Sequence, residues 1–178
     1  MAKEHVTALQ SMELCRSLTA AELDAIAAIV ERREIAAGKE LFHEGDAGDG
    51  LYLVVAGEVN VIKLGADGEH VLAKLGTGAL LGEMSLITAE ARSATGRAQA
   101  PTVALHVPAA AFRALLDSGS TAALKIARAI AEVLARRLAT MNNLVLGLSS
   151  GKAAIDKTTG MKTQQLRDLH RTMQVWSF

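Results

Sequence analysis

A carboxylate and a guanidinium lie nine positions apart near the middle of the chain, and both suit the binding of a phosphorylated sugar. Glu83 belongs to a Gly-Glu-Met-Ser-Leu run at residues 82–86, and Arg92 begins an Arg-Ser-Ala-Thr run at residues 92–95. Arginine donates two parallel hydrogen bonds to a phosphate, and glutamate accepts a hydrogen bond from a ribose hydroxyl. A short helical turn opening at Gly82 would aim backbone N–H groups at the same anion. These residues predict a site for a compact ligand that carries a phosphate and a ribose.

The bulk composition argues against several classes of protein. The chain has 178 residues, of which 50% are apolar but only 3% aromatic, so we expect a core of Ala, Leu, Val and Ile. Nineteen basic and nineteen acidic residues cancel, which gives no overall charge for attracting nucleic acid or a membrane. The single cysteine, Cys15, has no partner for an internal disulfide, residues 1–9 lack an apolar signal core, and no apolar run approaches the ~20 residues that cross a bilayer. We therefore expect a cytoplasmic protein without a membrane partner.

The first thirty residues read as two helices. Residues 5–16 and 19–31 carry apolar side chains at helical spacing. Thr19 followed by Glu22 is a capping box, which satisfies backbone donors at the start of the second helix.

The middle of the chain reads as short strands separated by glycine turns. Glycine and aspartate cluster at residues 45–50 and 65–68, where tight turns need a positive φ. The expected strands are Lys39–His43, Leu51–Ala56, Glu58–Leu64, Val71–Leu75, Arg97–Ala100 and Thr102–Val107. This pattern predicts an α+β fold in which a small antiparallel β-roll, of the jelly-roll or double-stranded β-helix type, occupies residues 33–107 between N-terminal helices and a long C-terminal helix.

Helical spacing returns after Pro108, with helices expected at 109–116 and 121–148. The apolar stripe of the longer helix either mediates a homodimer or is buried within a monomer. From residue 149 we expect a linker, followed by a short amphipathic tail helix over 162–176 that either docks on a partner or packs locally. The expected organisation is thus one domain over 1–148, with helices in 5–31 and 109–148, and a linker and tail over 149–178.

These features together resemble the family of cyclic-nucleotide-binding domains, the type found in catabolite activator protein, in the regulatory subunit of cyclic-AMP-dependent protein kinase and in nucleotide-gated channels. The resemblance covers roughly residues 10–148. Its anchors are the Leu-Phe-His-Glu-Gly-Asp-Ala-Gly-Asp run at 41–49, the Leu-Tyr-Leu-Val-Val-Ala-Gly-Glu-Val run at 51–59 and the run at 82–95. The third anchor resembles the family's phosphate-binding cassette.

The resemblance implies a role for each residue of the predicted site. Glu83 matches the glutamate that accepts from the ribose 2′-hydroxyl, and Arg92 matches the arginine that holds the cyclic phosphate. The rest of the phosphate cradle would come from Gly82, Met84, Ser85, Ser93 and Ala94, and the apolar wall from Val71, Leu72 and Ala73. On the helix after the roll, the residues expected near the base are Arg137, Thr140, Met141, Asn142 and Asn143.

Other interpretations of the same residues stay open. Glu83 and Arg92 could instead form a structural salt bridge with each other, and Ser93 could be a turn residue. A hydroxyl at Ser93 could also meet the 2-amino group of a syn guanine, so the ligand is cyclic AMP, cyclic GMP or both. His43, His70 and His106 are too dispersed for a metal site, and we expect each at the surface or at a strand end. No metal, further cofactor or catalytic group is expected.

The resulting prediction is a cytoplasmic cyclic-nucleotide receptor that is not an enzyme. It would signal through rearrangement of the 121–148 helix to a protein partner, with the 150–178 tail as one route. The thirty residues after Leu148 lack a recognisable helix–turn–helix, which disfavours DNA binding. The alternatives are an interaction module whose nucleotide site is weak or unused, and a minimal transcription regulator.

Overall fold

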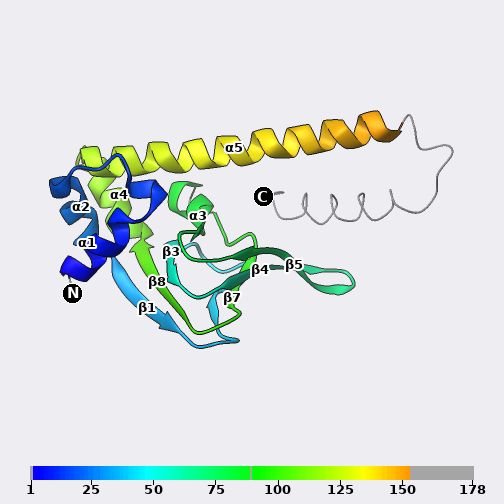
Figure 1. Cartoon of the computed structure of the whole chain (residues 1–178), viewed down its shortest axis with the longest axis horizontal. Coiled ribbons are helices and arrows are strands. Elements are labelled where there is room, and N and C mark those ends of the chain that lie inside the picture. The colour runs from blue at the N-terminus through cyan, green and yellow to red at the C-terminus, as the bar shows by residue number, and fades with distance from the viewer. Residues whose placement is uncertain (1, 89, 153–178) are drawn as a thin grey trace. The chain divides into compact units, whose positions relative to one another are not determined.

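The computed structural model describes residues 2–88 and 90–152, and the chain divides into two compact units, Met1–Ile130 and Ala131–Phe178. Two antiparallel four-stranded sheets form the described core of the first unit, in the orders β1-β8-β3-β6 and β2-β7-β4-β5 (Figure 1). The strands are β1 Glu31–Ile35, β2 Glu40–Phe42, β3 Gly50–Ala56, β4 Val59–Gly65, β5 Gly68–Leu75, β6 Leu80–Leu81, β7 Thr95–Ala98 and β8 Thr102–Pro108. The predicted antiparallel β-roll with flanking helices is confirmed.

The N-terminal helices begin and end elsewhere than predicted. Helix α1 spans Ala2–Gln10 and a 3₁₀ turn, η1, spans Glu13–Cys15, so a continuous helix over 5–16 is wrong. The hydroxyl of Ser11 donates to the carbonyl of Ala8 (2.7 Å), a local bond of the kind that competes with helix continuation, and Met12 is extended. Helix α2, Ala20–Ala27, begins with the predicted capping box, in which Thr19 and Glu22 each accept from the other's backbone N–H.

Two strands were not expected from the sequence. Residues 31–35, assigned partly to the second helix, instead form β1, which pairs with β8 along its whole length from Glu31↔His106 to Ile35↔Thr102. Strand β6 has only two residues, and it pairs with β3 beside Tyr52 and Leu53. These pairings are nonlocal, so they override weak local preference. Strand β6 matters for the site because the chain leaves it directly at Gly82.

The C-terminal helices are longer than predicted. Helix α4 spans Ala109–Asp117 and α5 spans Thr121–Lys152, so a linker that begins at Ser149 is wrong. Serine and glycine lower helix propensity by only about 0.5–1 kcal/mol each, and a helix that is already formed propagates cooperatively. The predicted tail helix over 162–176 lies outside the described residues. None of the helices in the described ranges is long and apolar enough to cross a membrane.

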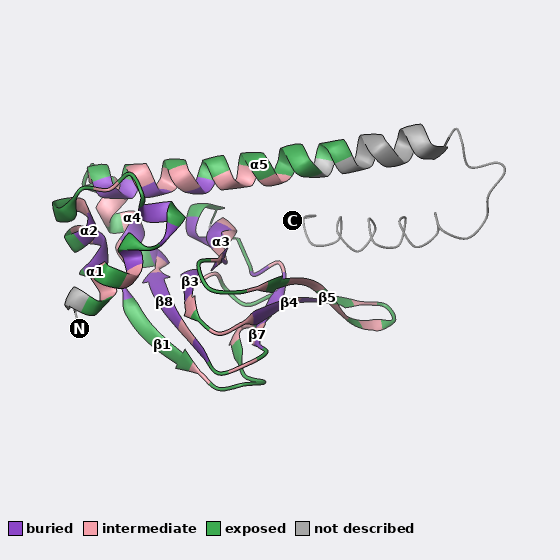
Figure 2. Ribbon diagram, viewed as in Figure 1, coloured by how far each residue is buried: buried purple, intermediate pink, exposed green. Residues whose placement is uncertain are grey.

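Buried side chains gather along β3 and β8 and on the helices that cover them (Figure 2). Phe112 of α4 is fully buried, and α4 packs against β3 and β8. A second cluster joins Tyr52, Val54, Val59, Leu81 and Ala104, with Phe42 packed at its edge. This second cluster borders the predicted site, because Leu81 precedes Gly82.

Replacing Phe112 by alanine is expected to lower the free energy of unfolding by about 3–5 kcal/mol, since a fully buried aromatic side chain would leave a cavity. Urea denaturation followed by circular dichroism measures this. Leu124→Ala is the matched control, because Leu124 of α5 is 55% exposed and its removal should change stability by less than about 0.5 kcal/mol. Equal losses in the two variants would contradict the assignment of α4 to the core.

Candidate functional site

The predicted cassette is a short helix and a loop that begin at a glycine where any side chain would be strained. Helix α3, Glu83–Thr88, follows Gly82, whose φ of 76° lies in the left-handed region. A Cβ at Gly82 would stand 2.0 Å from Nη1 of Arg92. Nη1 instead donates to the Gly82 carbonyl at 3.2 Å. The absence of a side chain at Gly82 therefore lets the guanidinium reach the start of α3.

Arg92 is a buried cation with a defined counter-ion. Its side chain is 1% exposed, and Nη2 forms an ion pair with Asp49, whose side chain is 53% exposed. The guanidinium carbon lies 4.2 Å from the centre of the Phe42 ring and 5.7 Å from that of Tyr52, which adds cation–π attraction. Its Nε is buried and makes no hydrogen bond within the described ranges. Because Asp49 reaches solvent, the pair links a buried arginine to the surface.

The loop before β3 fixes the backbone of Arg92 from both sides. The Arg92 N–H donates to the Asp46 carbonyl, and the Gly45 N–H donates to the Arg92 carbonyl, each at 2.8 Å. The same loop packs tightly on α3, since a Cβ at Gly48 would stand 2.1 Å from Cβ of Ser85. Loop 43–49 thus sets both the position of Arg92 and its distance from α3.

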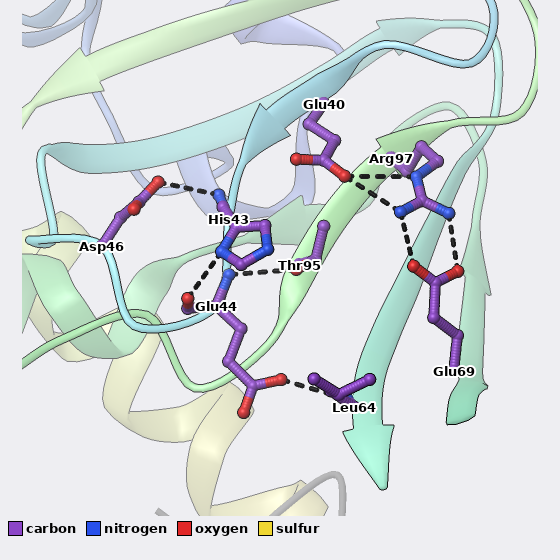
Figure 3. A network of polar contacts seen from close by, with 8 residues as sticks. All are labelled: Glu40, His43, Glu44, Asp46, Leu64, Glu69, Thr95 and Arg97. Carbon is purple, nitrogen blue, oxygen red and sulfur yellow. Dashed lines mark hydrogen bonds and ion pairs between the residues drawn. The ribbon is translucent and has the colours of Figure 1, made fainter. Parts of the chain in front are cut away.

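Lys63 of β4 holds the segment that follows Arg92. Its Nζ donates to the Ser93 carbonyl (2.8 Å) and forms an ion pair with Glu44 (2.7 Å). The Glu44 N–H donates to the hydroxyl of Thr95 (3.0 Å), and the Glu44 carboxylate accepts from the N–H of Leu64 (3.1 Å), as Figure 3 shows. Partial burial opposes ionisation of Glu44, but the hydrogen bonds from Lys63 and Leu64 hold its pKa below the ordinary value.

Arg97 ties the strand after the cassette to two others. From β7 its guanidinium bonds Glu40 of β2 (2.9 Å) and Glu69 of β5 (2.8 Å to each carboxylate oxygen) (Figure 3). The hydrogen bonds that Arg97 donates to Glu69 and Glu40 raise the pKa of Arg97, and the one to Glu69 lowers the pKa of that carboxyl group. β7 begins at Thr95, so this clamp fixes the exit of the cassette.

Sequence reasoning missed two residues beside Arg92. The sequence places Asp49 in a glycine-rich turn and in the first anchor of the resemblance and predicts no contact for it, yet it pairs with Arg92 and accepts from the Tyr52 hydroxyl (3.2 Å). Burial and then the nearby Asp49 raise the pKa of Tyr52 to about 12.

His106 is the second of these residues, and the expectation that it lies at the surface or at a strand end is wrong. It is 4% exposed, inside β8, and its ring stacks on that of Tyr52 with 4.5 Å between centres. A signal for this was present in the sequence, because His106 lies within the apolar run from Val103 to Val107, which is typical of a strand buried on both faces.

The structure gathers the residues predicted to form the cradle within one segment. Glu83, Ser85 and Ala94 are buried, and Met84 and Ser93 are half-buried. The ion pair of Arg92 is made with Asp49, and the role of Glu83 as an acceptor for ribose stays a prediction.

The predicted apolar wall lies on β5. Val71 is 42% exposed, while Leu72 and Ala73 are half-buried. Leu72 is a β-bulge, because Val71 pairs with Ile62 whereas Ala73 pairs with Val61.

The residues predicted to reach the base lie on α5 beyond Ile130, in the second compact unit. Arg137 is half-buried, and Thr140, Asn142 and Asn143 are exposed. The Thr140 hydroxyl donates to the carbonyl of Arg136 (3.0 Å). Contact of these residues with a ligand stays a prediction.

Neither a metal centre nor the cavity beside α1 coincides with the predicted site in the described residues. In the parts of the chain that are described, no three His, Cys, Asp or Glu side chains gather as a metal site would require. A cavity of about 570 Å³ lies beside α1, bounded by residues of α1, β1, β3 and β8. None of the predicted ligand-binding residues lines this cavity, so it does not support the predicted site. Its lining residues are Glu4, His5, Ala8, Arg32, Val55, Ala56, Val103 and Leu105.

Comparison with known proteins gives the same assignment from independent evidence. The sequence model of the cyclic nucleotide-binding domain matches residues 32–118. The N-terminal domain of a transcriptional regulator from Streptomyces coelicolor is 32% identical, with a TM-score of 0.64, 72% of this chain covered and 93% of that chain covered. A cyclic nucleotide-binding domain from Methylobacillus flagellatus is 28% identical, with a TM-score of 0.70 and coverage of 82% and 83%.

Curated relatives extend well beyond the matched region. The cyclic AMP receptor protein of Thermus thermophilus is 35% identical over 131 residues, which are 73% of this chain and 59% of that protein. A lysophospholipase from Chaetomium globosum is 31% identical over 133 residues, but the match spans only 9% of it. The domain thus occurs in proteins of very different size. This chain belongs to the cyclic nucleotide-binding domain family, as its sequence match, its β-roll and its cassette show.

Proposed function

We propose that this chain is a receptor for a cyclic purine nucleotide, cyclic AMP or cyclic GMP, and that it binds the ligand at α3 and Arg92. The observation that carries the proposal is the buried Arg92, held by Asp49 and by the Gly82 carbonyl at the start of α3. Burying a guanidinium costs desolvation energy. Binding an anionic ligand would offset that cost. Family membership supplies the class of ligand.

Each predicted residue has a task in this proposal. Arg92 binds the cyclic phosphate, aided by backbone N–H groups of Gly82, Met84, Ser93 and Ala94 and by the Ser85 region of α3. Glu83 accepts from the ribose 2′-hydroxyl. Val71, Leu72 and Ala73 of β5 offer apolar surface to the ligand, and Arg137, Thr140 and Asn143 of α5 read the base.

Asp49 makes the phosphate site selective for a ligand with a single negative charge. Its carboxylate fixes the guanidinium in one orientation before the ligand arrives, which lowers the ordering cost of binding. It also places a negative charge beside the phosphate position, so a ligand with several negative charges is disfavoured more than a phosphodiester.

The proposed output is a change in α5 that another protein detects. A ligand shifts an equilibrium only if it contacts the two states differently, and in this proposal Arg137, Thr140 and Asn143 of α5 are the residues assigned to such contacts. We propose that the protein acts in the cytoplasm, that the 121–148 segment mediates a homodimer, and that the 150–178 tail contributes to binding a protein partner. The proposed activity is binding and not catalysis, and the proposed partner is a protein and not DNA.

A second candidate is an interaction module whose site is left without nucleotide. The observation that favours it is that Arg92 already has a carboxylate and a carbonyl as partners. One structural neighbour, 21% identical with a TM-score of 0.63, is described as the regulatory subunit of a cAMP-independent protein kinase A from Trypanosoma brucei, so this fold does not by itself specify cyclic AMP.

Replacing Arg92 by alanine is expected to weaken cyclic-nucleotide binding by on the order of 2–5 kcal/mol, because a desolvated phosphate would lose its charged partner. Isothermal titration calorimetry with cyclic AMP, cyclic GMP and a cyclic dinucleotide measures this and ranks the ligands.

Arg32→Ala is the control for this series, because Arg32 of β1 also pairs with a carboxylate, that of Glu34, but lies outside the cassette and the contacts that hold it. It should keep the affinity within about threefold, since losses at exposed ion pairs are small. A wild-type protein that binds none of the three ligands would favour the interaction module. Binding that survives Arg92→Ala would place the phosphate elsewhere.

The role of Glu83 is tested by removing the ribose hydroxyl rather than only the carboxylate. Wild-type protein should bind 2′-deoxy cyclic AMP weaker than cyclic AMP by about 1.5–3 kcal/mol, the range for hydrogen bonds to charged groups. In Glu83→Gln this difference should shrink to less than half, because the charged acceptor is gone. Glu90→Gln, at an exposed carboxylate close to α3, should keep the full difference. A difference of equal size in wild type and Glu83→Gln would show that Glu83 is not the acceptor.

A further inference from the structure

His106 is a buried titratable group that the proposed binding site does not use directly. It lies in β8 with 4% exposure, and both ring nitrogens are buried without a hydrogen bond in the described part of the chain. The ring is fixed by stacking on Tyr52, which lies in β3. A buried imidazole whose nitrogens are both unsatisfied is uncommon, and it calls for an explanation beyond packing.

Two carboxylates face the two ring nitrogens. Nε2 lies 3.4 Å from Oδ2 of Asp49, and Nδ1 lies 3.7 Å from Oε2 of Glu31. Both contacts are ion pairs only when the ring is protonated. The other charged groups around the ring are Arg33 of β1, which pairs with Glu31, and Arg92, which pairs with the second carboxylate oxygen of Asp49.

Asp49 therefore lies between two basic side chains. Its Oδ1 contacts the guanidinium of Arg92, and its Oδ2 faces Nε2 of His106. We propose that His106 is a positioning residue that acts through Asp49, so that a proton on His106 strengthens the binding of the anionic ligand at Arg92. This inference rests on the proposed function of Arg92.

The sign follows from the charges. A neutral His106 leaves the negative charge of Asp49 partly uncompensated beside the phosphate position. Protonation of His106 adds one positive charge beside Asp49, which compensates that negative charge and so favours a bound anion. By linkage, a bound anion must raise the proton affinity of His106 by the same factor.

The pH range follows from the surroundings of the ring. Burial is the largest influence and lowers the pKa of His106 below the ordinary 6.5, while Asp49 and Glu31 act against that shift. His106 therefore takes up a proton at lower pH than an ordinary histidine does. A phosphodiester keeps its single charge throughout this range, so the ligand does not titrate.

Stability and affinity should change in opposite directions. A histidine whose folded-state pKa is lowered contributes stability above its unfolded-state pKa, and that contribution is lost as the pH falls. Acid should therefore destabilise the fold through His106 while it strengthens nucleotide binding. General acid damage to the protein would weaken both.

The experiment is a calorimetric titration with cyclic AMP at several pH values from about 7.5 to about 5, which reaches below the ordinary range of histidine because burial lowers the pKa of His106. The wild-type dissociation constant should fall by about three- to tenfold as the pH is lowered, equivalent to a rise in the pKa of His106 of about half to one unit on binding. In His106→Gln the dissociation constant should vary by less than about twofold over the same range.

His70→Gln is the matched control, because His70 lies in the β4–β5 hairpin and pairs with Asp67, away from Asp49. It should keep the wild-type pH profile. If wild type and His106→Gln bind with the same pH profile, the proposed coupling between His106 and the ligand is overturned and the receptor function is not. A wild-type protein that binds no nucleotide at any pH would overturn both.

A nuclear magnetic resonance titration of His106 in the wild-type protein tests the proposal even if the His106→Gln variant does not fold. Saturation with cyclic AMP should raise the pKa of His106, and an unchanged pKa would overturn the proposal. In the nucleotide-free protein, Asp49→Asn should lower the pKa of His106, because the negative charge facing Nε2 is removed. If that pKa does not fall, Asp49 is not the link.

Discussion

The ion pair between Arg92 and Asp49 is the interaction on which the candidate site depends. A buried guanidinium is tolerated only with a counter-ion and hydrogen bonds, and Asp49 and the Gly82 carbonyl supply these. Two close contacts permit the arrangement: Gly82 leaves room for Nη1, and Gly48 lets the loop that carries Asp49 rest on α3. Phe42 then covers the cation and keeps water from one of its faces. The pair joins two segments that are distant in sequence.

Around this pair, the roll supplies a frame whose parts restrain one another. Backbone hydrogen bonds tie loop 43–49 to Arg92, Lys63 fixes the carbonyl of Ser93, and Arg97 clamps β7 to β2 and β5. These contacts come from four strands and reach the cassette from different directions. A site for a small ligand built in this way is preorganised, because few of its groups need to be ordered when the ligand arrives.

Much of this fold could be predicted from the sequence because its signals are local. The Thr19–Glu22 capping box and the glycine turns around the hairpins depend on neighbouring residues, and they appear where expected. Strand β1 was missed because its charged residues show no apolar alternation and its partner β8 lies some seventy residues away. The candidate site shows the same contrast between local signals, which the sequence reveals, and long-range contacts, which it does not. Glu83 and Arg92 were visible as a motif, whereas the tie from Arg92 to Asp49 spans 43 positions and nothing in either segment specifies it.

The bulge at Leu72 separates the β4–β5 hairpin into two parts with different registers. The inner part pairs Val59 with Leu75 and lies beside β7, while the outer part pairs Ile62 with Val71 and ends at Gly65 and Gly68. Residues added at the turn beyond Gly65 would leave this pairing in place, together with the contacts of Lys63 and Leu64 that hold the cassette. The turn at 65–68 is thus the place where insertions can accumulate during evolution, or where a fluorescent reporter can be grafted, at least cost to the rest of the roll.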